Sequence, residues 1–276
     1  MSPYISMIGA GWLGFPLAKT LINENCKVFA TTTKEEKRDH LLALGIKAEI
    51  LIFDNFFLEK EFTLPSETEI LIITLPPSLG KQVNLEHYKA ILAHILEQTV
   101  KIKRLRKILF TSSTSVYGNA MGILTEEREI QPQTNQEKIL AETEDFLKQK
   151  SEDYDLFILR LGGLVGPGRE PAHFFKNKKD LPGGEIQVNL VHQTDVIEII
   201  KKIIMNDIPQ GIYNITADEH PARGLFYPQR AKERGMEEPT FIWGSEPERY
   251  VSNEKVKKVT GYTLVYPDPL FFPGGD

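Results

Sequence analysis

The stretch YISMIGAGWLGFPLAKTL, residues 4–21, decides the fold. Its first five residues form a short apolar run that stops at Gly9, which is typical of a buried strand. The spacing of Leu13, Leu17 and Leu21 then predicts an amphipathic helix. The stretch therefore predicts a strand, a glycine-rich turn and a helix in direct succession.

The turn has the pattern G-x-G-x-x-G from Gly9 to Gly14, with Trp12 and Leu13 before the last glycine. Between a strand and a helix, this pattern indicates a dinucleotide site. Gly9 permits a tight turn, Gly11 lets the backbone approach a pyrophosphate, and Gly14 lets the helix and strand pack closely. Backbone N–H groups at the start of the helix then bind the anion. The alternative is a tight turn that holds no ligand.

Alternation of apolar strands and helices continues through the first 163 residues. Strands that are apolar on both faces and alternate with helices predict a parallel sheet covered on both sides. Right-handed crossovers then give an α/β, doubly wound Rossmann fold. The further strands are predicted at residues 27–33, 46–54, 69–77, 107–113 and 154–163, and the further helices at 35–45, 84–102 and 135–149.

The pattern weakens after Gly166. Residues 186–205 predict a strand, a turn capped near Thr194 or Asp195, and a helix, and residues 211–217 predict one more strand. The last sixty residues are rich in proline and aromatic residues, and we expect them to be irregular. The predicted division is a dinucleotide-binding Rossmann domain of residues 1–165 and 191–216, and a smaller substrate-binding lobe of residues 166–190 and 217–276.

Composition restricts the class of protein. The 276 residues carry a net charge of −5, which argues against a nucleic-acid surface. The basic run at residues 101–107 is interpreted as the solvated end of a helix, with a phosphate or nucleic-acid patch as the alternative. Cys26 is the single cysteine, and neither a signal peptide nor an apolar span is evident, so we expect a cytoplasmic protein that does not bind membranes. The histidines lack the spacing of a metal site, and no metal is predicted.

Residues after the second strand bear on the choice between NAD and NADP. NAD specificity usually shows as an acid there that bonds the ribose 2′-OH. Thr32 and Thr33 take that place, followed by Lys34 and Arg38. Hydroxyls and cations suit a 2′-phosphate, so NADP is preferred over NAD, unless the two cations are merely solvated. The other expected cofactor contacts are Asp54 at the adenine and Leu75 and Pro76 on the ribose side.

Several motifs in order resemble a known family. They are GAGWLG (9–14), TSSTSVYG (111–118), LRLGGLVGPGR (159–169), NLVHQTDV (189–196) and IYNITADEHPAR (212–223). Together they resemble an extended short-chain dehydrogenase/reductase of the NAD-dependent epimerase/dehydratase type, and more closely its YeeZ-like subgroup. The resemblance implies an NAD(P) cofactor and a small-molecule substrate such as a nucleotide sugar. It also implies that the helices at 84–102 and 135–149 can pair across a homodimer.

The chemistry implied by the family is hydride transfer to or from the nicotinamide. The family uses a tyrosine as acid/base, a lysine one helical turn later and a serine that polarises the reacting oxygen. Ser113 matches the serine, and Lys138 matches the lysine, which would bond the nicotinamide ribose. The tyrosine position is Thr134, which is a departure from the family pattern. A threonine hydroxyl has no accessible pKa near neutrality and needs an adjacent base to act.

Three functions follow from this departure. The chain is an oxidoreductase or epimerase with a rearranged acid/base, such as Tyr117 or His192; or it binds a dinucleotide without turnover, as a regulatory module; or it keeps the fold with no ligand. Tyr117 alternatively lines the substrate pocket or packs beneath its turn, and His192 alternatively holds a loop. Arg160 and Arg169 could each grip an anionic substrate or stay solvated.

Overall fold

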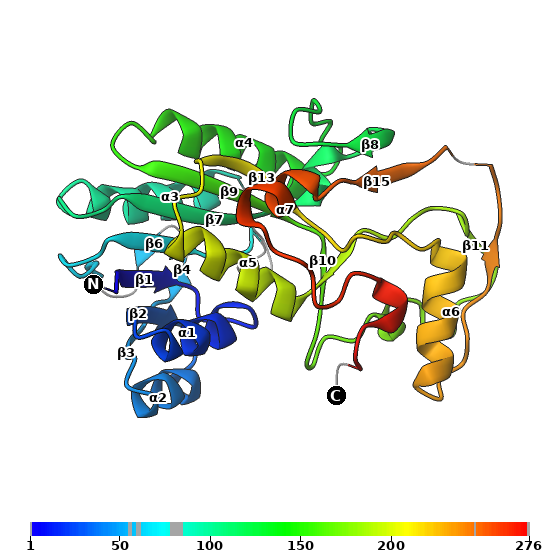
Figure 1. Cartoon of the computed structure of the whole chain (residues 1–276), viewed down its shortest axis with the longest axis horizontal. Helices are drawn as coiled ribbons and strands as arrows, with labels where there is room; N and C mark the ends of the chain where they lie inside the picture. Colours follow the sequence, from blue (N-terminus) through cyan, green and yellow to red (C-terminus); the bar gives the residue numbers. More distant parts are fainter. Residues whose placement is uncertain (1, 55–56, 59–61, 78–84, 246, 275–276) are drawn as a thin grey trace. The chain divides into compact units, whose positions relative to one another are not determined.

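The apolar run Tyr4–Ile8 is strand β1, with all five residues buried in a seven-stranded sheet (Figure 1). The computed structural model describes residues 2–54, 57–58, 62–77, 85–245 and 247–274. The strand order is β13-β9-β7-β6-β1-β2-β3. These strands are β1, β2 (Lys27–Thr32), β3 (Lys47–Ile50), β6 (Ile70–Ile73), β7 (Lys107–Ser113), β9 (Asp155–Leu161) and β13 (Gly211–Ile215).

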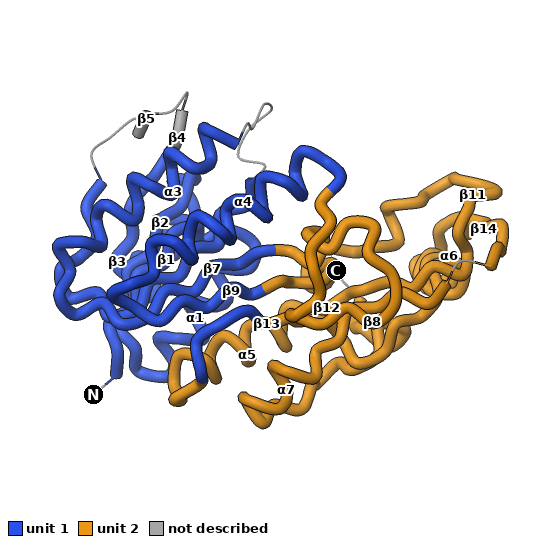
Figure 2. The backbone as a smooth tube through the Cα atoms, turned by 90° about the horizontal axis from the view of Figure 1, so that it is seen from above, with its two compact units in different colours: residues 1–112, 133–159, 209–212 blue, residues 113–132, 160–208, 213–276 orange. Residues whose placement is uncertain are grey.

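The sheet is wound in both directions from β1. This strand pairs in parallel with β2 on one side and β6 on the other, and β2–β3 and β6–β7 are also parallel. Figure 2 shows α3 and α4 on one side of the strands and α1 on the other, and α2 packs against β2 and β3. The predicted doubly wound Rossmann fold is therefore confirmed. The helices are α1 (Gly14–Asn23), α2 (Glu35–Ala43), α3 (Leu85–Thr99) and α4 (Asn135–Gln149).

Two predicted details change in this region. The basic run does not end a helix, because α3 already ends at Thr99. Lys107 instead starts β7 with only 5% of its surface exposed, and its ammonium lies 5.4 Å from the centre of the Phe157 ring. The predicted third strand is also shorter, since β3 ends at Ile50 and a separate antiparallel pair follows, β4 (Phe53–Asp54) with β5 (Phe57–Leu58).

The chain divides into two units (Figure 2). Unit 1 comprises residues 1–112, 133–159 and 209–212, and unit 2 comprises residues 113–132, 160–208 and 213–276. The predicted dinucleotide-binding domain included residues 113–132, 160–165, 191–208 and 213–216, which lie in unit 2. The division into cofactor-binding and substrate-binding parts stays a prediction.

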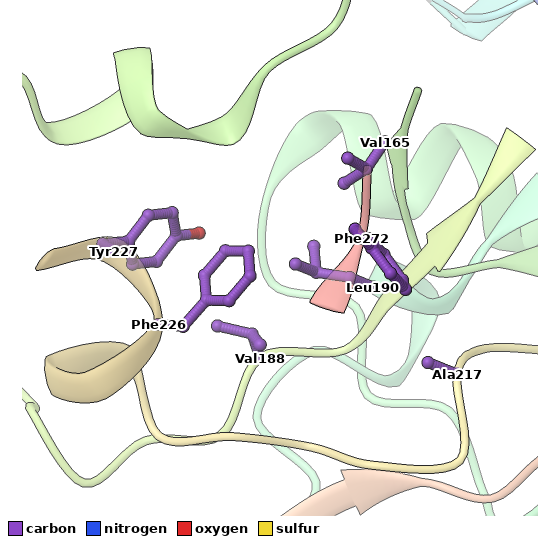
Figure 3. Packing of buried hydrophobic residues seen from close by; sticks show 7 residues of the cluster. All are labelled: Val165, Val188, Leu190, Ala217, Phe226, Tyr227 and Phe272. Atoms are coloured by element: carbon purple, nitrogen blue, oxygen red, sulfur yellow. The ribbon is translucent and has the colours of Figure 1, made fainter. Parts of the chain in front are cut away.

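Unit 2 has its own core, which Figure 3 shows. Phe226 and Tyr227 of α6 pack there with strand and loop residues and with Phe272 near the C-terminus. The core residues are Val165, Val188, Leu190, Ala217, Phe226, Tyr227 and Phe272. Regular elements of this unit are η1 (Thr114–Tyr117), β8 (Gly122–Leu124), β10 (Gly163–Val165), η2 (Pro171–Phe175), β11 (Leu181–Pro182), β12 (Leu190–His192), α5 (Gln193–Met205), α6 (Arg223–Glu233), β14 (Phe241–Ile242), β15 (Arg249–Val251), α7 (Glu254–Thr260) and η3 (Pro269–Phe271).

The prediction that the C-terminal region is irregular is wrong at α6 and α7. Pro228 lies inside α6, where a missing N–H and a ring clash normally end a helix, and this residue made the segment resemble a loop. Phe226 is fully buried and Tyr227 nearly so, and burial of this face outweighs the proline. No helix in the described ranges is long and apolar enough to cross a membrane.

Candidate functional site

The candidate site lies in unit 1, where the strand order reverses between β1 and β6. Gly9 follows β1 with a φ of +104°, a conformation that favours glycine. Its N–H donates to Thr31 Oγ1 (3.1 Å), and its carbonyl accepts from Thr74 Oγ1 (2.5 Å). Thr31 near the end of β2 and Thr74 directly after β6 thus fix the turn from both sides. The sequence prediction did not identify Thr31 and Thr74 in this role, because their partner is distant in the chain.

The glycines at positions 11 and 14 face different surroundings. A Cβ atom on Gly14 would collide with the Gly9 carbonyl oxygen and lie 3.1 Å from Met7 Sδ. A Cβ on Gly11 would meet only that same oxygen, at 3.9 Å. Gly14 is therefore required by packing between helix and strand, whereas the space beside Gly11 is open, as the approach of a pyrophosphate requires.

The start of α1 suits an anion. No side chain caps it at Leu13, and its first turn contains no acidic residue. The partial positive charge of the helix N-terminus is therefore not neutralised by an acid of that turn. Trp12 is half-buried and Leu13 is buried just before the helix. The predicted anion site thus fits this end of α1.

The predicted cofactor ligands at and after the end of β2 differ in their exposure and in their hydrogen-bond partners. Thr32 is buried, and its Oγ1 accepts the N–H of Lys34 at 3.4 Å. Thr33 and Lys34 are exposed. The Arg38 guanidinium donates to Asp39 Oδ1 from Nε (3.0 Å) and Nη2 (2.8 Å), so this predicted cofactor ligand already has a partner.

The segment after β6 reaches the glycine turn. The side chain of Leu75 is buried and would lie 3.1 Å from a Cβ on Gly9. Its carbonyl accepts from the hydroxyl of Tyr88 on α3 (2.6 Å), and burial of Tyr88 raises the pKa of that hydroxyl. Pro76 is exposed. Asp54 is in β4, and its side chain lies outside the described part of the chain.

Thr134 begins α4 as its N-cap. Its side-chain oxygen accepts the N–H of Glu137 (3.3 Å), and Glu137 Oε2 accepts the N–H of Thr134 (3.0 Å). This reciprocal arrangement is a capping box, which stabilises the start of a helix. Lys138 is exposed in the first turn that follows. The threonine at the family's tyrosine position therefore has a structural role, which the S/T-x-x-E spacing could have indicated.

Ser113 and Arg169 both lie in unit 2. Ser113 is half-buried, and its Oγ accepts the N–H of Ser115 (3.1 Å) at the start of η1. Arg169 is exposed in a tight turn that its N–H closes on the Gly166 carbonyl (2.9 Å). The substrate contacts expected of Ser113 and Arg169 stay predictions.

Tyr117 is fully buried beneath its turn. Its hydroxyl accepts from Arg160 Nη1 (3.0 Å) and lies 2.8 Å from Asn214 Oδ1 and 2.9 Å from the Thr125 carbonyl. Desolvation raises the pKa of Tyr117, although the Arg160 guanidinium opposes this. This geometry favours packing over proton transfer for Tyr117. Arg160 is 2% exposed, so the structure bears out neither alternative predicted for it, a grip on a substrate or a solvated side chain.

His192 is a buried cap of α5. Its Nδ1 accepts the N–H of Thr194 (3.2 Å), and its ring lies 4.2 Å from that of Tyr266 and 5.6 Å from that of Phe272, between centroids. Within the described ranges, Nε2 has no hydrogen-bond partner. Desolvation lowers the pKa of His192, against the opposite effect of Asp195. These contacts favour the interpretation in which His192 holds the start of α5.

Asp195 does not cap α5 as predicted. Its carboxylate is fully buried and accepts from the Tyr262 hydroxyl (2.8 Å) and from the N–H groups of Val265 (2.7 Å) and Tyr266 (3.1 Å). The cap near Thr194 is instead supplied by His192. Asp195 therefore attaches a segment near the C-terminus to α5.

Burial of His192 predicts a loss of stability in acid. An unfolded imidazole takes up a proton near pH 6.5 or below, which the buried ring resists, so the free energy of unfolding should be highest above that pH and fall below it. Urea midpoints at pH 7.5 and 5.5 measure the loss. His192→Asn keeps a capping oxygen and should lose less, whereas His40→Asn, at an exposed position, should match the wild type. An equally steep loss in His192→Asn would contradict this account.

The sequence and the fold were compared with those of known proteins. No family model matches the chain. The chain is 36% identical over 273 residues to the YeeZ protein of Escherichia coli strain K12, covering 98% of each. The YeeZ protein of Escherichia coli O157:H7 gives the same values.

Solved structures share the fold at lower identity. A functionally unknown conserved protein from Silicibacter pomeroyi DSS is similar with a TM-score of 0.77 and 19% identity, covering 98% of this chain and 96% of that one. A UDP-glucuronic acid 4-epimerase from Bacillus cereus, in complex with NAD, gives a TM-score of 0.74 and 16% identity, covering 96% of each chain. Because the sequence similarity covers 98% of the YeeZ protein at 36% identity, the chain belongs to the YeeZ family.

Proposed function

We propose that this chain binds a nicotinamide dinucleotide at the turn Gly9–Gly14, with NADP(H) preferred over NAD(H). The observation that carries this proposal is the open space beside Gly11, next to a helix start that no side chain caps. A diphosphate fits there because backbone N–H groups and the helix dipole favour an anion. The NAD bound to the Bacillus cereus epimerase of the same fold supports the cofactor class.

The surrounding residues suit the other parts of the cofactor. Thr33 and Lys34 are exposed at the end of β2 and would contact the 2′-phosphate. Leu75 and Pro76 would line the ribose, and Asp54 would meet the adenine. Lys138 would bond the nicotinamide ribose. When bound, the cofactor supplies hydride transfer.

The reaction class we propose is that of an oxidoreductase or a nucleotide-sugar epimerase or dehydratase. Ser113 would polarise a substrate oxygen, because a hydroxyl that accepts one hydrogen bond still has its proton to donate. Arg169 is exposed and would contact an anionic group of the substrate. The match to the family motifs supports these roles. Pairing of α3 and α4 across a homodimer also stays a prediction.

A second candidate function is a non-catalytic NAD(P)-binding regulatory module. The observation that favours it is that the candidate proton carriers already have structural roles. The Thr134 hydroxyl is used in a capping box, and Tyr117 and His192 are buried with structural partners. General acid–base catalysis requires a group within hydrogen-bond reach of the substrate, and these three positions do not favour it.

A fluorescence titration with NADPH tests the cofactor proposal. We expect saturable binding that is tighter for NADPH than for NADH. Lys34→Ala should weaken NADPH binding roughly tenfold, through loss of a charged hydrogen bond, and leave NADH binding unchanged. Lys19→Ala, an exposed lysine of α1, is the control. Tighter binding of NADH by the wild type would overturn the preference for NADP.

A second experiment separates the enzyme from the regulatory module. Sugar nucleotides and small carbonyl compounds are screened for consumption of NADPH by the wild type and by Ser113→Ala. Turnover that Ser113→Ala abolishes supports the enzyme. NADPH binding without any turnover, and with no effect of Ser113→Ala, supports the module.

A further inference from the structure

Unit 1 contains a cavity of about 460 Å³ at the end of the sheet where β7 and β9 begin. Leu105 and Tyr154 line it just before these strands, and Asp155 N donates to the Arg106 carbonyl there (2.9 Å). The glycine turn follows the opposite, carboxyl end of β1. We propose that this cavity binds an uncharged, mainly apolar molecule that carries a hydrogen-bond acceptor, such as an aromatic ketone.

The inner wall of the cavity is apolar. Leu96 of α3 and Ile102 of the following segment are buried, and Phe146 of α4 is half-buried. A ligand that covers these side chains removes apolar surface from water, which favours binding. A volume of about 460 Å³ lies within the usual range for pockets that hold small organic molecules.

Tyr154 supplies the polar group. It lines the cavity, and its buried hydroxyl has no hydrogen-bond partner in the part of the chain that the structure describes. A buried polar group without a partner is costly, so an acceptor brought by a ligand would relieve this cost. Burial, and to a lesser extent Asp153, raises the pKa of Tyr154 to about 12, so the hydroxyl stays protonated and donates.

Charges at the rim argue for an uncharged ligand. The exposed side chains that line the cavity are Val100, two lysines, Lys103 and Lys150, and two acids, Glu97 and Asp153. Their formal charges cancel, so the rim as a whole gives no preference to an anion or a cation. The NADP(H) proposed for the glycine turn is strongly anionic and does not match this site.

Prodan, 6-propionyl-2-(dimethylamino)naphthalene, tests the proposal because it is an uncharged aromatic ketone whose emission shifts to the blue in apolar surroundings. With the full chain we expect saturable binding of one Prodan per chain, unchanged by saturating NADPH. Tyr154→Phe should weaken this binding roughly threefold to tenfold by removing one hydrogen bond. Ala93→Trp should abolish it by filling the cavity, whose wall includes Ala93.

The matched control is Ala90→Trp, which adds the same ring at an exposed position of α3 that is not among the residues lining the cavity. It should bind Prodan as the wild type does. The proposal is overturned if no saturable binding occurs, or if Ala93→Trp binds as well as Ala90→Trp. It is also overturned if Prodan does not bind and Ala93→Trp alone changes the elution volume in sizing chromatography, since the cavity would then belong to a contact between copies.

Discussion

Gly14→Ala is expected to destabilise the protein by about 3 kcal/mol or more, because the added methyl group overpacks a rigid site. The atom that a Cβ would meet is the carbonyl oxygen of Gly9. That carbonyl is held by Thr74 Oγ1 at 2.5 Å, and Gly9 N is held by Thr31 Oγ1, so the turn cannot move aside without breaking hydrogen bonds. Thermal unfolding measured by circular dichroism should show the midpoint lowered by roughly 5–10 °C.

Gly11→Ala is the matched variant, in which we expect cofactor binding to change and stability to stay the same. Its methyl group would have no neighbour closer than the Gly9 carbonyl oxygen at 3.9 Å, and we expect the free energy of unfolding to stay within about 1 kcal/mol of the wild type. NADPH binding should nevertheless weaken at least roughly tenfold, because the backbone can no longer approach the diphosphate. Wild-type affinity in Gly11→Ala would count against the proposed site, and wild-type stability in Gly14→Ala would contradict the packing of this turn.

These two variants separate what the sequence predicted at this turn from what it left open. The order of strand, G-x-G-x-x-G turn and helix predicted the close packing at Gly14, which the structure confirms. It did not predict that Thr31 and Thr74 hold Gly9, because Thr31 belongs to β2 and Thr74 follows β6, and both meet the glycine only in the folded sheet. Local patterns thus identified the turn, and long-range pairing supplies its rigidity.

The hydroxyl-rich end of β7 shows the same limit. Thr111 Oγ1 donates to the Ile73 carbonyl (3.3 Å), and Ser112 Oγ donates to the buried Glu144 (2.7 Å). Ser113 Oγ accepts from the N–H of Ser115. Each of these three hydroxyls has a structural partner on a neighbouring strand, a helix or the next turn. Only the partner of Ser113 is close enough in sequence to be predicted from turn chemistry.

The role of Tyr117 could not be predicted either, because its partners are distant in the sequence. Its hydroxyl partners include Arg160 and Asn214, which are 43 and 97 residues away in the sequence. No periodicity connects positions so far apart, so burial and activity could not be distinguished. At α6 the error has another origin, since a general rule about Pro228 was outweighed by the burial of Phe226.

Asp195→Ala is expected to cost about 3–5 kcal/mol in the free energy of unfolding of the protein, because three buried hydrogen-bond donors lose their acceptor. The carboxylate is fully buried and accepts three hydrogen bonds. Its removal leaves the Tyr262 hydroxyl and the N–H groups of Val265 and Tyr266 without this acceptor. The attached segment also places Tyr266 against His192, so the packing at the start of α5 should loosen as well. Urea unfolding followed by circular dichroism measures the loss.

Two further variants show whether the loss has this cause. Tyr262→Phe removes only one of the three hydrogen bonds, and we expect it to cost about 1–3 kcal/mol. Asp145→Ala removes an exposed aspartate that pairs with Lys148 on α4, and its cost should stay below about 1 kcal/mol because such surface pairs contribute little. If Asp195→Ala were no more damaging than Asp145→Ala, the carboxylate would not be what holds the C-terminal segment to α5. Equal losses in Asp195→Ala and Tyr262→Phe would assign the whole effect to the tyrosine hydroxyl and none to the two backbone N–H groups.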